Sequence, residues 1–227
     1  LGPGKQLSRP WVIYDCQTYK MWYTVLGDPE TPEKIFFANS SNCVDWATYG
    51  IVLDGSSGSW DEIVHKPVVL FDGITYKMWY LGTRISCHFP IRVGYATSLD
   101  GISWTKHADP VLVPGGNGGW DDFTISTMTV ISNGTHYIMW YSAEDYSAGT
   151  TRMGVATSID GISWTKYSNN PVLVPGPNEW DDGHVWAGPV IKDGNLYEMW
   201  YTGQRRDYPG RIGLAVSFDG FSWSKYE

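Results

Sequence analysis

Short apolar runs, each bounded by turn residues, recur along this chain with a period of roughly 58 residues. In the last copy these runs are Val190-Ile191, Leu196 to Tyr201, Ile212 to Val216 and Phe221 to Lys225. Asp193-Gly194 and Asp219-Gly220, two dipeptides that favour tight hairpin turns, separate the first run from the second and the third from the fourth. The pattern of each copy therefore predicts four short antiparallel strands.

Three motifs define the repeat. The motif Y-x-M-W-Y begins at Tyr19, Tyr76, Tyr137 and Tyr197. The motif S-x-D-G-x-S-W begins at Ser98, Ser158 and Ser217, and a degenerate copy runs from Ser40 to Trp46. The motif W-D-[DE] begins at Trp60, Trp120 and Trp180. We expect the tryptophans of the first motif to fill the space between neighbouring sheets; they are Trp22, Trp79, Trp140 and Trp200.

Four-stranded antiparallel units repeated around an axis are typical of a β-propeller. The sequence thus predicts an all-β chain that forms one domain over residues 1–227, a propeller of four four-stranded antiparallel blades. The expected blades cover roughly residues 7–56, 62–115, 123–175 and 183–227. Blade edges left unpaired would be exposed, so the alternative is that the four blades are part of a five-bladed ring.

Composition agrees with an all-β fold and narrows the partners. The chain has 15% aromatic residues with 26 Gly and 13 Pro, which suits pleated surfaces joined by tight turns. A net charge of −8 argues against nucleic acid as a partner. No apolar run approaches the ~20 residues that span a membrane, so no membrane partner is expected.

Cysteine usage and the chain start leave several questions open. Cys16, Cys43 and Cys87 show no C-x-x-C spacing, so we expect no metal cluster and no cofactor. A disulfide between Cys16 and Cys43 stays open, as does the oligomeric state. The chain starts without a basic and then apolar leader; the compartment is undetermined, and secretion is compatible with the sequence.

The repeat resembles that of the propeller glycosidases, the superfamily of arabinanases, β-xylosidases, levansucrases, invertases and mannoside phosphorylases. The likeness rests on P-V-[IL]-x-x-D-G-x-x-Y-x-M-W-Y-T-G, I-G-x-A-x-S-x-D-G-x-x-W and N-P-V-L-x-P-G, and it covers essentially the whole chain. It implies five blades, and it implies catalytic carboxylates on the innermost strands in contexts such as R-D-P and E-G-P.

The chain departs from that pattern at the innermost strands. The corresponding stretches read Ser8-Arg9-Pro10-Trp11, His65-Lys66-Pro67-Val68, Ser126-Thr127-Met128-Thr129 and Trp186-Ala187-Gly188-Pro189. None contains Asp or Glu, and Ala187 stands where an E-G-P motif would have its Glu. The usual catalytic pair of a glycosidase, an acid and a base or nucleophile, is missing from these positions.

Topology indicates where other functional groups would gather, because the loop after the second strand and the loop before the first strand of a blade open on one face. The candidate catalytic carboxylates on this face are Glu62, Asp122, Asp182 and Glu144. The candidate ligand-binding residues are Arg9, His65, Lys66, Asp122, Thr124, Ser126, Asp182, His184 and Trp186. We expect the first acid of each W-D-[DE] motif to bond nearby backbone N–H groups, and the two histidines to be hydrogen-bonded rather than metal-bound.

Polar groups and aromatic rings in a concave site suit sugars. The main hypothesis is therefore a carbohydrate-binding propeller, related to glycoside hydrolases but without their usual hydrolytic residues, whose partner is an oligosaccharide or polysaccharide. One alternative is an active glycoside hydrolase that uses displaced carboxylates. The other is a structural or protein-interaction propeller.

Overall fold

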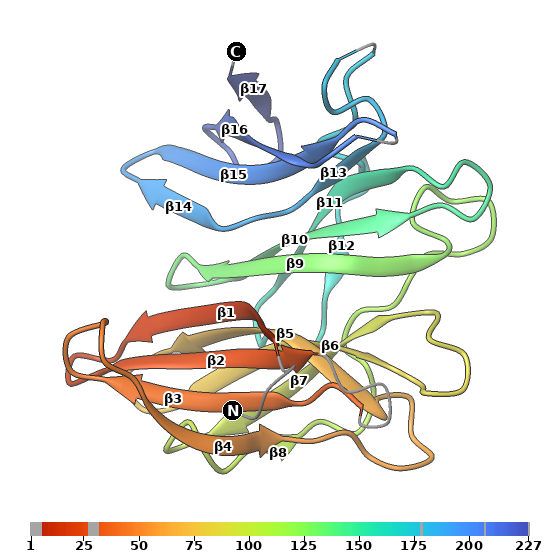
Figure 1. Ribbon diagram of the computed structural model, residues 1–227. Helices are drawn as coiled ribbons and strands as arrows, with labels where there is room; N and C mark the ends of the chain where they lie inside the picture. Colours follow the sequence, from red (N-terminus) through yellow and green to blue (C-terminus); the bar gives the residue numbers. More distant parts are fainter. Residues whose placement is uncertain (1–5, 27–31, 178, 207, 227) are drawn as a thin grey trace. The chain divides into compact units, whose positions relative to one another are not determined.

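The computed structural model describes residues 6–26, 32–177, 179–206 and 208–226. Two compact units make up the chain, Leu1–Leu112 and Val113–Glu227. Every regular element among the described residues is a β-strand (Figure 1), which confirms the all-β prediction. The outermost residues of the predicted 1–227 domain, 1–5 and 227, lie outside the described residues.

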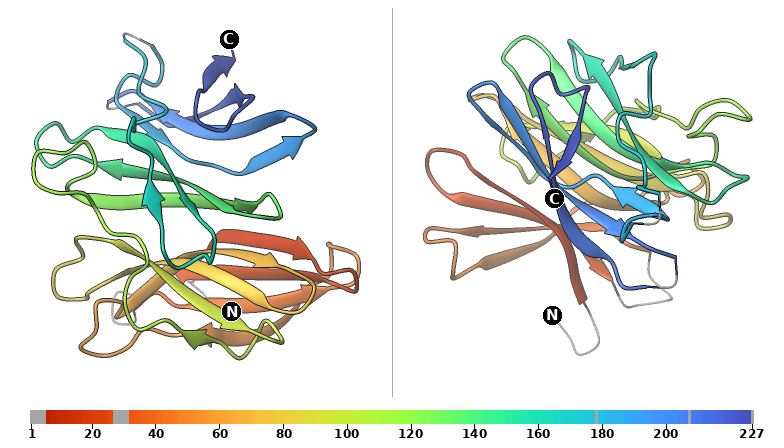
Figure 2. Two further views of the ribbon diagram at one scale, coloured as in Figure 1. Left: turned by 180° about the vertical axis from the view of Figure 1, so that it is seen from behind. Right: turned by 90° about the horizontal axis from the view of Figure 1, so that it is seen from above.

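The first unit contains two four-stranded antiparallel sheets, and in each the strands follow one another in sequence order. The strands of the first sheet are β1 (Gln6–Tyr14), β2 (Tyr19–Leu26), β3 (Ile35–Ser40) and β4 (Ala47–Leu53). The strands of the second are β5 (Ile63–Phe71), β6 (Tyr76–Thr83), β7 (Arg92–Ser98) and β8 (Thr105–Lys106). Figure 2 shows β1 to β4, in red and orange, as one twisted sheet, the form that right-handed strands adopt when they pair.

The second unit differs from the expectation of separate four-stranded sheets, because its strands form one nine-stranded sheet. Its first half contains β9 (Thr124–Ser132), β10 (Tyr137–Glu144), β11 (Thr151–Ser158) and β12 (Thr165–Lys166). Its second half contains β13 (His184–Trp186), β14 (Val190–Asp193), β15 (Leu196–Gln204), β16 (Arg211–Ser217) and β17 (Ser224–Tyr226). A single parallel pair, Thr151 with His184, joins the two halves.

The split between β13 and β14 has a local cause. A proline alone is not that cause, because β1 and β5 continue through Pro10 and Pro67. A Cβ on Gly188 would lie 1.8 Å from the carbonyl oxygen of Trp200, so only glycine fits there. The Gly188-Pro189 step therefore interrupts a strand that is continuous in the other repeats, as β1, β5 and β9.

Buried tryptophans join neighbouring repeats within each unit, as the sequence predicts. The indole Nε1 of Trp22 donates to the carbonyl oxygen of Gly101 over 2.8 Å. In the second unit, Trp140 Nε1 donates to the carbonyl oxygen of Gly220 over 2.8 Å. Both tryptophans are fully buried, and both glycines have positive φ (77° and 78°), a conformation that glycine adopts without strain.

Trp200 does not follow this pattern. Trp79 is fully buried like Trp22 and Trp140, but 39% of Trp200 is exposed. Along β15, buried residues alternate with exposed or half-buried ones, whereas β10 is buried from Ile138 to Ala143. The expectation that Trp200 fills a space between sheets is therefore wrong in this structure.

Candidate functional site

The first acid of each W-D-[DE] motif is part of the scaffold. Each of these carboxylates is buried. Each accepts a hydrogen bond from a tyrosine hydroxyl and one from a lysine Nζ. The triads are Asp61 with Tyr80 (2.9 Å) and Lys106 (2.8 Å), Asp121 with Tyr141 (3.2 Å) and Lys166 (2.6 Å), and Asp181 with Tyr201 (2.9 Å) and Lys225 (2.6 Å). Backbone partners were expected from the sequence, and in the third motif Asp181 Oδ1 does accept the Gly176 amide over 3.1 Å. The partners that all three acids share are side chains from two strands of the same repeat.

The second acid of two of these motifs ties two loops together. Glu62 accepts backbone N–H groups from Gly58 (2.9 Å) and Ile85 (3.1 Å). Asp122 accepts them from Gly118 (2.7 Å) and Tyr146 (2.8 Å), which lowers the pKa of Asp122 below its ordinary value. In the third motif, Asp182 lies 3.7 Å from Arg205 Nε.

The innermost strands of the first unit contain two strained positions. Arg9 and Lys66 have φ values of 56° and 50°, which lie in the left-handed region that residues other than glycine rarely adopt. Each lies at a register shift, between Ser8 and Trp11 in β1 and between His65 and Val68 in β5. Strain of this kind tends to cluster where a protein binds or reacts, because only the surrounding structure maintains it.

Arg9, Glu33 and His65, which we call the His65 cluster, meet beside these strained positions. Glu33 Oε2 accepts from Arg9 Nη1 over 3.1 Å and lies 2.9 Å from His65 Nδ1. His65 Nδ1 is also 2.9 Å from Arg9 Nη1. Glu33 was not a sequence candidate, although it lies in the loop after the second strand, on the face where function was expected.

Burial and charge set the protonation of the His65 cluster. Burial lowers the pKa of His65 below its ordinary value, although the hydrogen bond to Glu33 and its charge oppose that shift. Burial alone would raise the pKa of Glu33, but the hydrogen bond with His65 and the positive charges of Arg9 and Lys66 lower it overall. At neutral pH the arrangement is a carboxylate beside a neutral imidazole.

Glu144, Thr151, His184 and Trp186, the His184 cluster, meet in the second unit. The Thr151 hydroxyl donates to Glu144 Oε1 over 3.2 Å and lies 2.9 Å from His184 Nδ1. The His184 ring stacks on the indole of Trp186, with centroids 5.0 Å apart and planes 12° apart. Burial, together with the charge of Arg206, lowers the pKa of His184 despite the opposing charge of Glu144. Thr151 was not a sequence candidate; nothing in its surrounding motif marks it.

Two further candidate ligand-binding residues, Thr124 and Ser126, lie in β9. Thr124 is buried in β9, and Ser126 Oγ donates to the carbonyl oxygen of Ser142 over 3.4 Å. The Ala187 amide donates to Ser142 Oγ over 2.7 Å. In the first unit the Lys66 amide likewise donates to Thr24 Oγ1 over 3.1 Å. The two units thus use the same hydroxyl contact at the innermost strand.

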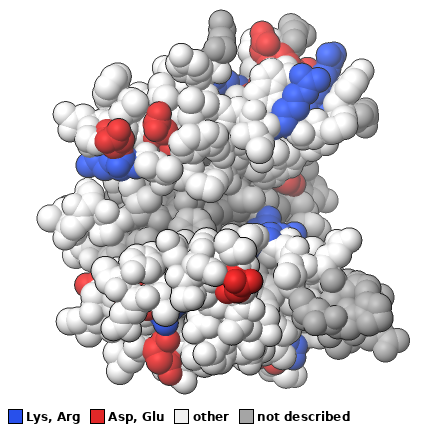
Figure 3. All heavy atoms as spheres, turned by 60° about the vertical axis from the view of Figure 1, so that its left-hand side comes forward, with Lys and Arg blue, Asp and Glu red and all other residues white. Residues whose placement is uncertain are grey.

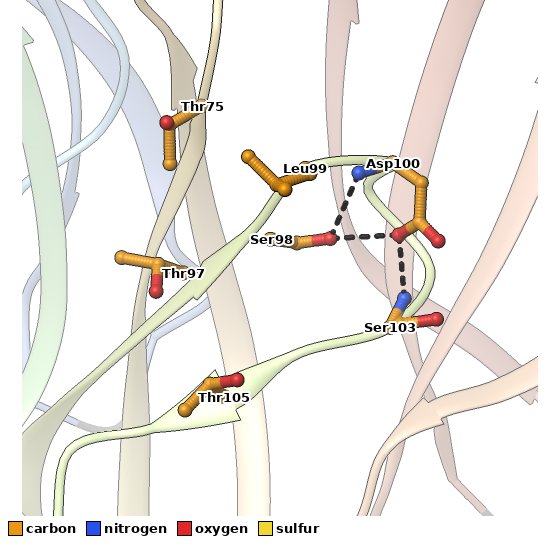
Figure 4. A pocket seen from close by; sticks show the side chains of 7 residues that line it. All are labelled: Thr75, Thr97, Ser98, Leu99, Asp100, Ser103 and Thr105. Carbon is orange, nitrogen blue, oxygen red and sulfur yellow. Dashed lines mark hydrogen bonds between the residues drawn. The ribbon is translucent and has the colours of Figure 1, made fainter.

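A pocket of ≈ 350 Å³ lies at the hairpin-turn end of the second sheet (Figure 4). Its lining consists of Thr75, Thr97, Ser98, Leu99, Asp100, Ser103 and Thr105. Ser98 Oγ donates to Asp100 Oδ1, which also accepts the Ser103 amide. These bonds close the turn, so Asp100 is structural.

Other surface features are simple. Figure 3 shows Lys, Arg, Asp and Glu scattered over one face in small mixed groups. Cys16, Cys43 and Cys87 are exposed and unbonded to each other. Within the described part of the chain no three His, Cys, Asp or Glu side chains are grouped to hold a metal ion, and no helix there has the length and apolarity to cross a membrane.

Sequence comparisons find two relatives but give no family assignment. No protein-family model matches the chain. Two uncharacterized proteins of Mycobacterium tuberculosis, from strains CDC 1551 / Oshkosh and ATCC 25618 / H37Rv, are 32% identical over 155 residues, 66% of this chain and 50% of theirs. The chain therefore spans about half the length of the curated relatives it matches.

Three solved structures superpose on nearly the whole chain. A glycoside hydrolase matches with a TM-score of 0.82 and 22% identity, over 100% of this chain and 74% of its own. A structure described as an RGII complex matches with a TM-score of 0.81 and 23% identity, over 99% of this chain and 74% of its own. A family 117 glycoside hydrolase of Zobellia galactanivorans matches with a TM-score of 0.77 and 17% identity, over 99% of this chain and 70% of its own. The chain shares the propeller fold of glycoside hydrolases.

Proposed function

We propose that this protein binds carbohydrate and that the His184 cluster contains the main binding surface. The observation that carries the proposal is the stacked pair of His184 and Trp186, two half-buried rings that lie nearly parallel. A flat aromatic surface suits the C–H face of a sugar ring. Beside it, the Glu144 carboxylate supplies a hydrogen-bonding group, which a sugar hydroxyl needs, and the buried Thr151 hydroxyl links Glu144 to His184.

Most carboxylates of the W-D-[DE] motifs already accept hydrogen bonds from other parts of the protein, and this supports sugar binding over hydrolysis. Glycoside hydrolysis needs one carboxyl group that donates a proton and a second that acts as base or nucleophile. Asp61, Asp121 and Asp181 are occupied by tyrosine and lysine, and Glu62 and Asp122 by backbone amides. A carboxylate that fixes loops in this way is poorly placed to transfer protons.

Hydrolysis with displaced carboxylates is the second candidate function, and one observation favours it. Among the described residues the Glu144 carboxylate accepts one hydrogen bond, from the Thr151 hydroxyl at 3.2 Å, so it is less constrained than Glu62 or Asp122. In this reading Glu144 acts with Asp182, whose contact with Arg205 is long (3.7 Å), while binding contacts come from neighbouring residues of the second unit. A scaffold that binds protein is the third reading, which a lack of sugar binding would favour.

The proposal extends to the other residues of the functional face. Thr124, Ser126, Asp122 and Asp182 would contribute polar contacts in the second unit, and Arg9, His65 and Lys66 in the first. We also propose that the four repeats act as the blades of one propeller. The RGII complex and the glycoside hydrolases among the structural neighbours support a carbohydrate as the ligand.

Saturation-transfer NMR tests the proposal with arabinan, fructan and mannan oligosaccharides. We expect transfer to at least one of them, and a loss of affinity of about tenfold or more in Trp186→Ala, since aromatic anchors in binding sites commonly contribute more than ~1.4 kcal/mol. Trp200→Ala is the matched control, because Trp200 is an exposed tryptophan of the same unit.

The same spectra separate the three readings. Transfer without new anomeric signals supports binding, whereas new reducing-end signals that vanish in Glu144→Gln support hydrolysis. If no oligosaccharide shows transfer, the carbohydrate proposal is wrong and the scaffold reading takes its place.

A further inference from the structure

His65 is a buried residue whose polar contacts are incomplete. The residue is 8% exposed. Among the described residues Nε2 is buried and has no hydrogen-bond partner, while Nδ1 lies 2.9 Å from both Glu33 Oε2 and Arg9 Nη1. Buried polar atoms are nearly always hydrogen-bonded, so an exception calls for an explanation.

We infer the tautomer from the contacts of Nδ1. A bond with Glu33 Oε2, 2.9 Å away, needs the proton on His65 Nδ1, because a carboxylate oxygen only accepts, whereas a bond from Arg9 Nη1, also 2.9 Å away, would need Nδ1 bare. We assign the proton to Nδ1, since Arg9 has Glu33 as an alternative acceptor. Arg9 Nη1 directs its own donation to the same oxygen over 3.1 Å. In the neutral ring the proton on Nδ1 leaves Nε2 as a bare lone pair. Carboxylates commonly fix imidazole rings in this way where the other nitrogen has a task.

Two independent features of the same strands indicate that this arrangement is maintained for a ligand. The residue directly after His65, Lys66, has a left-handed φ of 50°, and Arg9 has one of 56°. Both precede a proline, which disfavours the helical region of backbone space and adds to the constraint. The fold thus tolerates backbone strain and an unpartnered buried nitrogen at one place.

We propose that the His65 cluster is a second carbohydrate subsite, in which Glu33 positions His65 so that Nε2 accepts a hydrogen bond from a sugar hydroxyl. This inference rests on the proposed function. Arg9 complements the acceptor, because its side chain is 34% exposed and Glu33 accepts from its Nη1. A sugar hydroxyl can donate to Nε2 while a neighbouring sugar oxygen accepts from Arg9. The ligand class is a neutral polyhydroxylated sugar.

Glu33 is a positioning residue in this account, and imidazole ¹⁵N NMR tests it without any ligand. We expect the His65 spectrum of the free protein to show a protonated Nδ1 and a bare Nε2. In Glu33→Gln, which keeps the side-chain size, we expect a substantial population of the other tautomer. Asp54→Asn is the matched control, because Asp54 is an ion-paired carboxylate of the same unit that bonds Lys34. A protonated Nε2 in the unmodified protein would overturn the proposal.

A titration with the arabinan, fructan and mannan oligosaccharides tests the subsite itself. We expect the Nε2 resonance to shift as it accepts a hydrogen bond, and about tenfold weaker binding in Glu33→Gln with no change in Asp54→Asn. A shift of the Trp186 indole without any change at His65 would overturn the subsite and leave the proposed function standing. A change at His65 alone would support the subsite and move the main site away from Trp186. No change at either residue would overturn both.

Discussion

The two units use the same scaffold contacts and differ in the chemistry of their innermost strands. Both bury a tryptophan that donates to a positive-φ glycine, Trp22 to Gly101 and Trp140 to Gly220. In both units a side-chain hydroxyl also accepts a hydrogen bond from a backbone amide of the next repeat. Thr24 accepts from the Lys66 amide in the first unit, and Ser142 accepts from the Ala187 amide in the second. These shared contacts are what the repeat needs in order to fold.

The positions that differ indicate where function lies. At matching registers of β5 and β13, the first unit has His65 followed by Lys66, and the second has Trp186 followed by Ala187. Around them, one unit gathers Glu33 and a strained Arg9, and the other gathers an aromatic pair beside Glu144. Identical residues at matching positions of the two units would be explained by the needs of folding alone. Because the residues at these positions differ while the scaffold contacts are shared, we infer that they serve function.

The largest expected effect concerns the shared tryptophans. Trp22→Ala and Trp140→Ala should each lower the free energy of unfolding by about 3 to 5 kcal/mol, because each removes a fully buried ring. Trp200→Ala should cost about 1.5 kcal/mol or less, since Trp200 is part-exposed. Urea unfolding followed by far-UV circular dichroism measures these values. Equal costs at all three positions would show that the contrast between buried and exposed copies is wrong.

A smaller effect is expected at the repeated acid. Asp181→Ala should cost about 3 kcal/mol, because Tyr201 and Lys225 then lose their buried acceptor. Asp182→Ala, one residue along, should cost less than about 1 kcal/mol, since its long contact with Arg205 lies at the surface. The same denaturation experiment compares them, and a reversed order would contradict the division between scaffold and candidate site residues.

The pH dependence of stability sharpens the comparison of the two histidines. The folded-state pKa values of His65 and His184 are both lowered, mainly by burial. As pH falls, the histidines of the unfolded chain therefore become protonated before those of the folded protein. The free energy of unfolding should keep its full value above about pH 6.5 and should decrease below that pH, by at most about 1.4 kcal/mol per pH unit for each histidine. Replacing His65 with Gln should flatten this slope more than replacing His184, since His65 is the more deeply buried. A slope unchanged in both variants would mean that neither histidine titrates differently on folding.

The smallest effect is expected at the surface. Asp54→Asn should change the free energy of unfolding by less than about 0.5 kcal/mol, because the Lys34–Asp54 pair is exposed on the Asp54 side. Chemical denaturation in low and moderate salt measures it. A cost above about 1.5 kcal/mol, more than a surface pair supplies, would make Asp54 unsuitable as the control for Glu33.

The strands could be predicted from the repeat, because the aspartates of the D-G turns form local hydrogen bonds that determine where each strand ends. Asp100 and Asp219 close their turns through amides two and three residues further on, so a short motif fixes a local structure. For Asp219 these hydrogen bonds lower the pKa to about 2. The joining of the second unit into one sheet was not predictable, because it depends on one parallel pair between distant residues.

Part of each proposed site was among the sequence candidates. The sequence led us to expect His65, His184 and Glu144 on the loop face of their repeats, because strand and loop order determines which residues lie near one another, and each of them lies in a side-chain cluster of the structure. Glu33 and Thr151 were missed, since their roles arise from contacts with a neighbouring repeat 32 or 33 residues away. No local motif marks such residues, and only the packed structure brings them to the histidines.

The central claim, that the aromatic pair binds sugar, is tested most directly by following the tryptophan indole N–H signals during an oligosaccharide titration. Single Trp→Phe variants assign the Trp186 and Trp200 signals. The account predicts a saturable shift of the Trp186 signal with no shift of the Trp200 signal. Saturable binding that leaves Trp186 unmoved, or no binding by arabinan, fructan and mannan oligosaccharides, would contradict it.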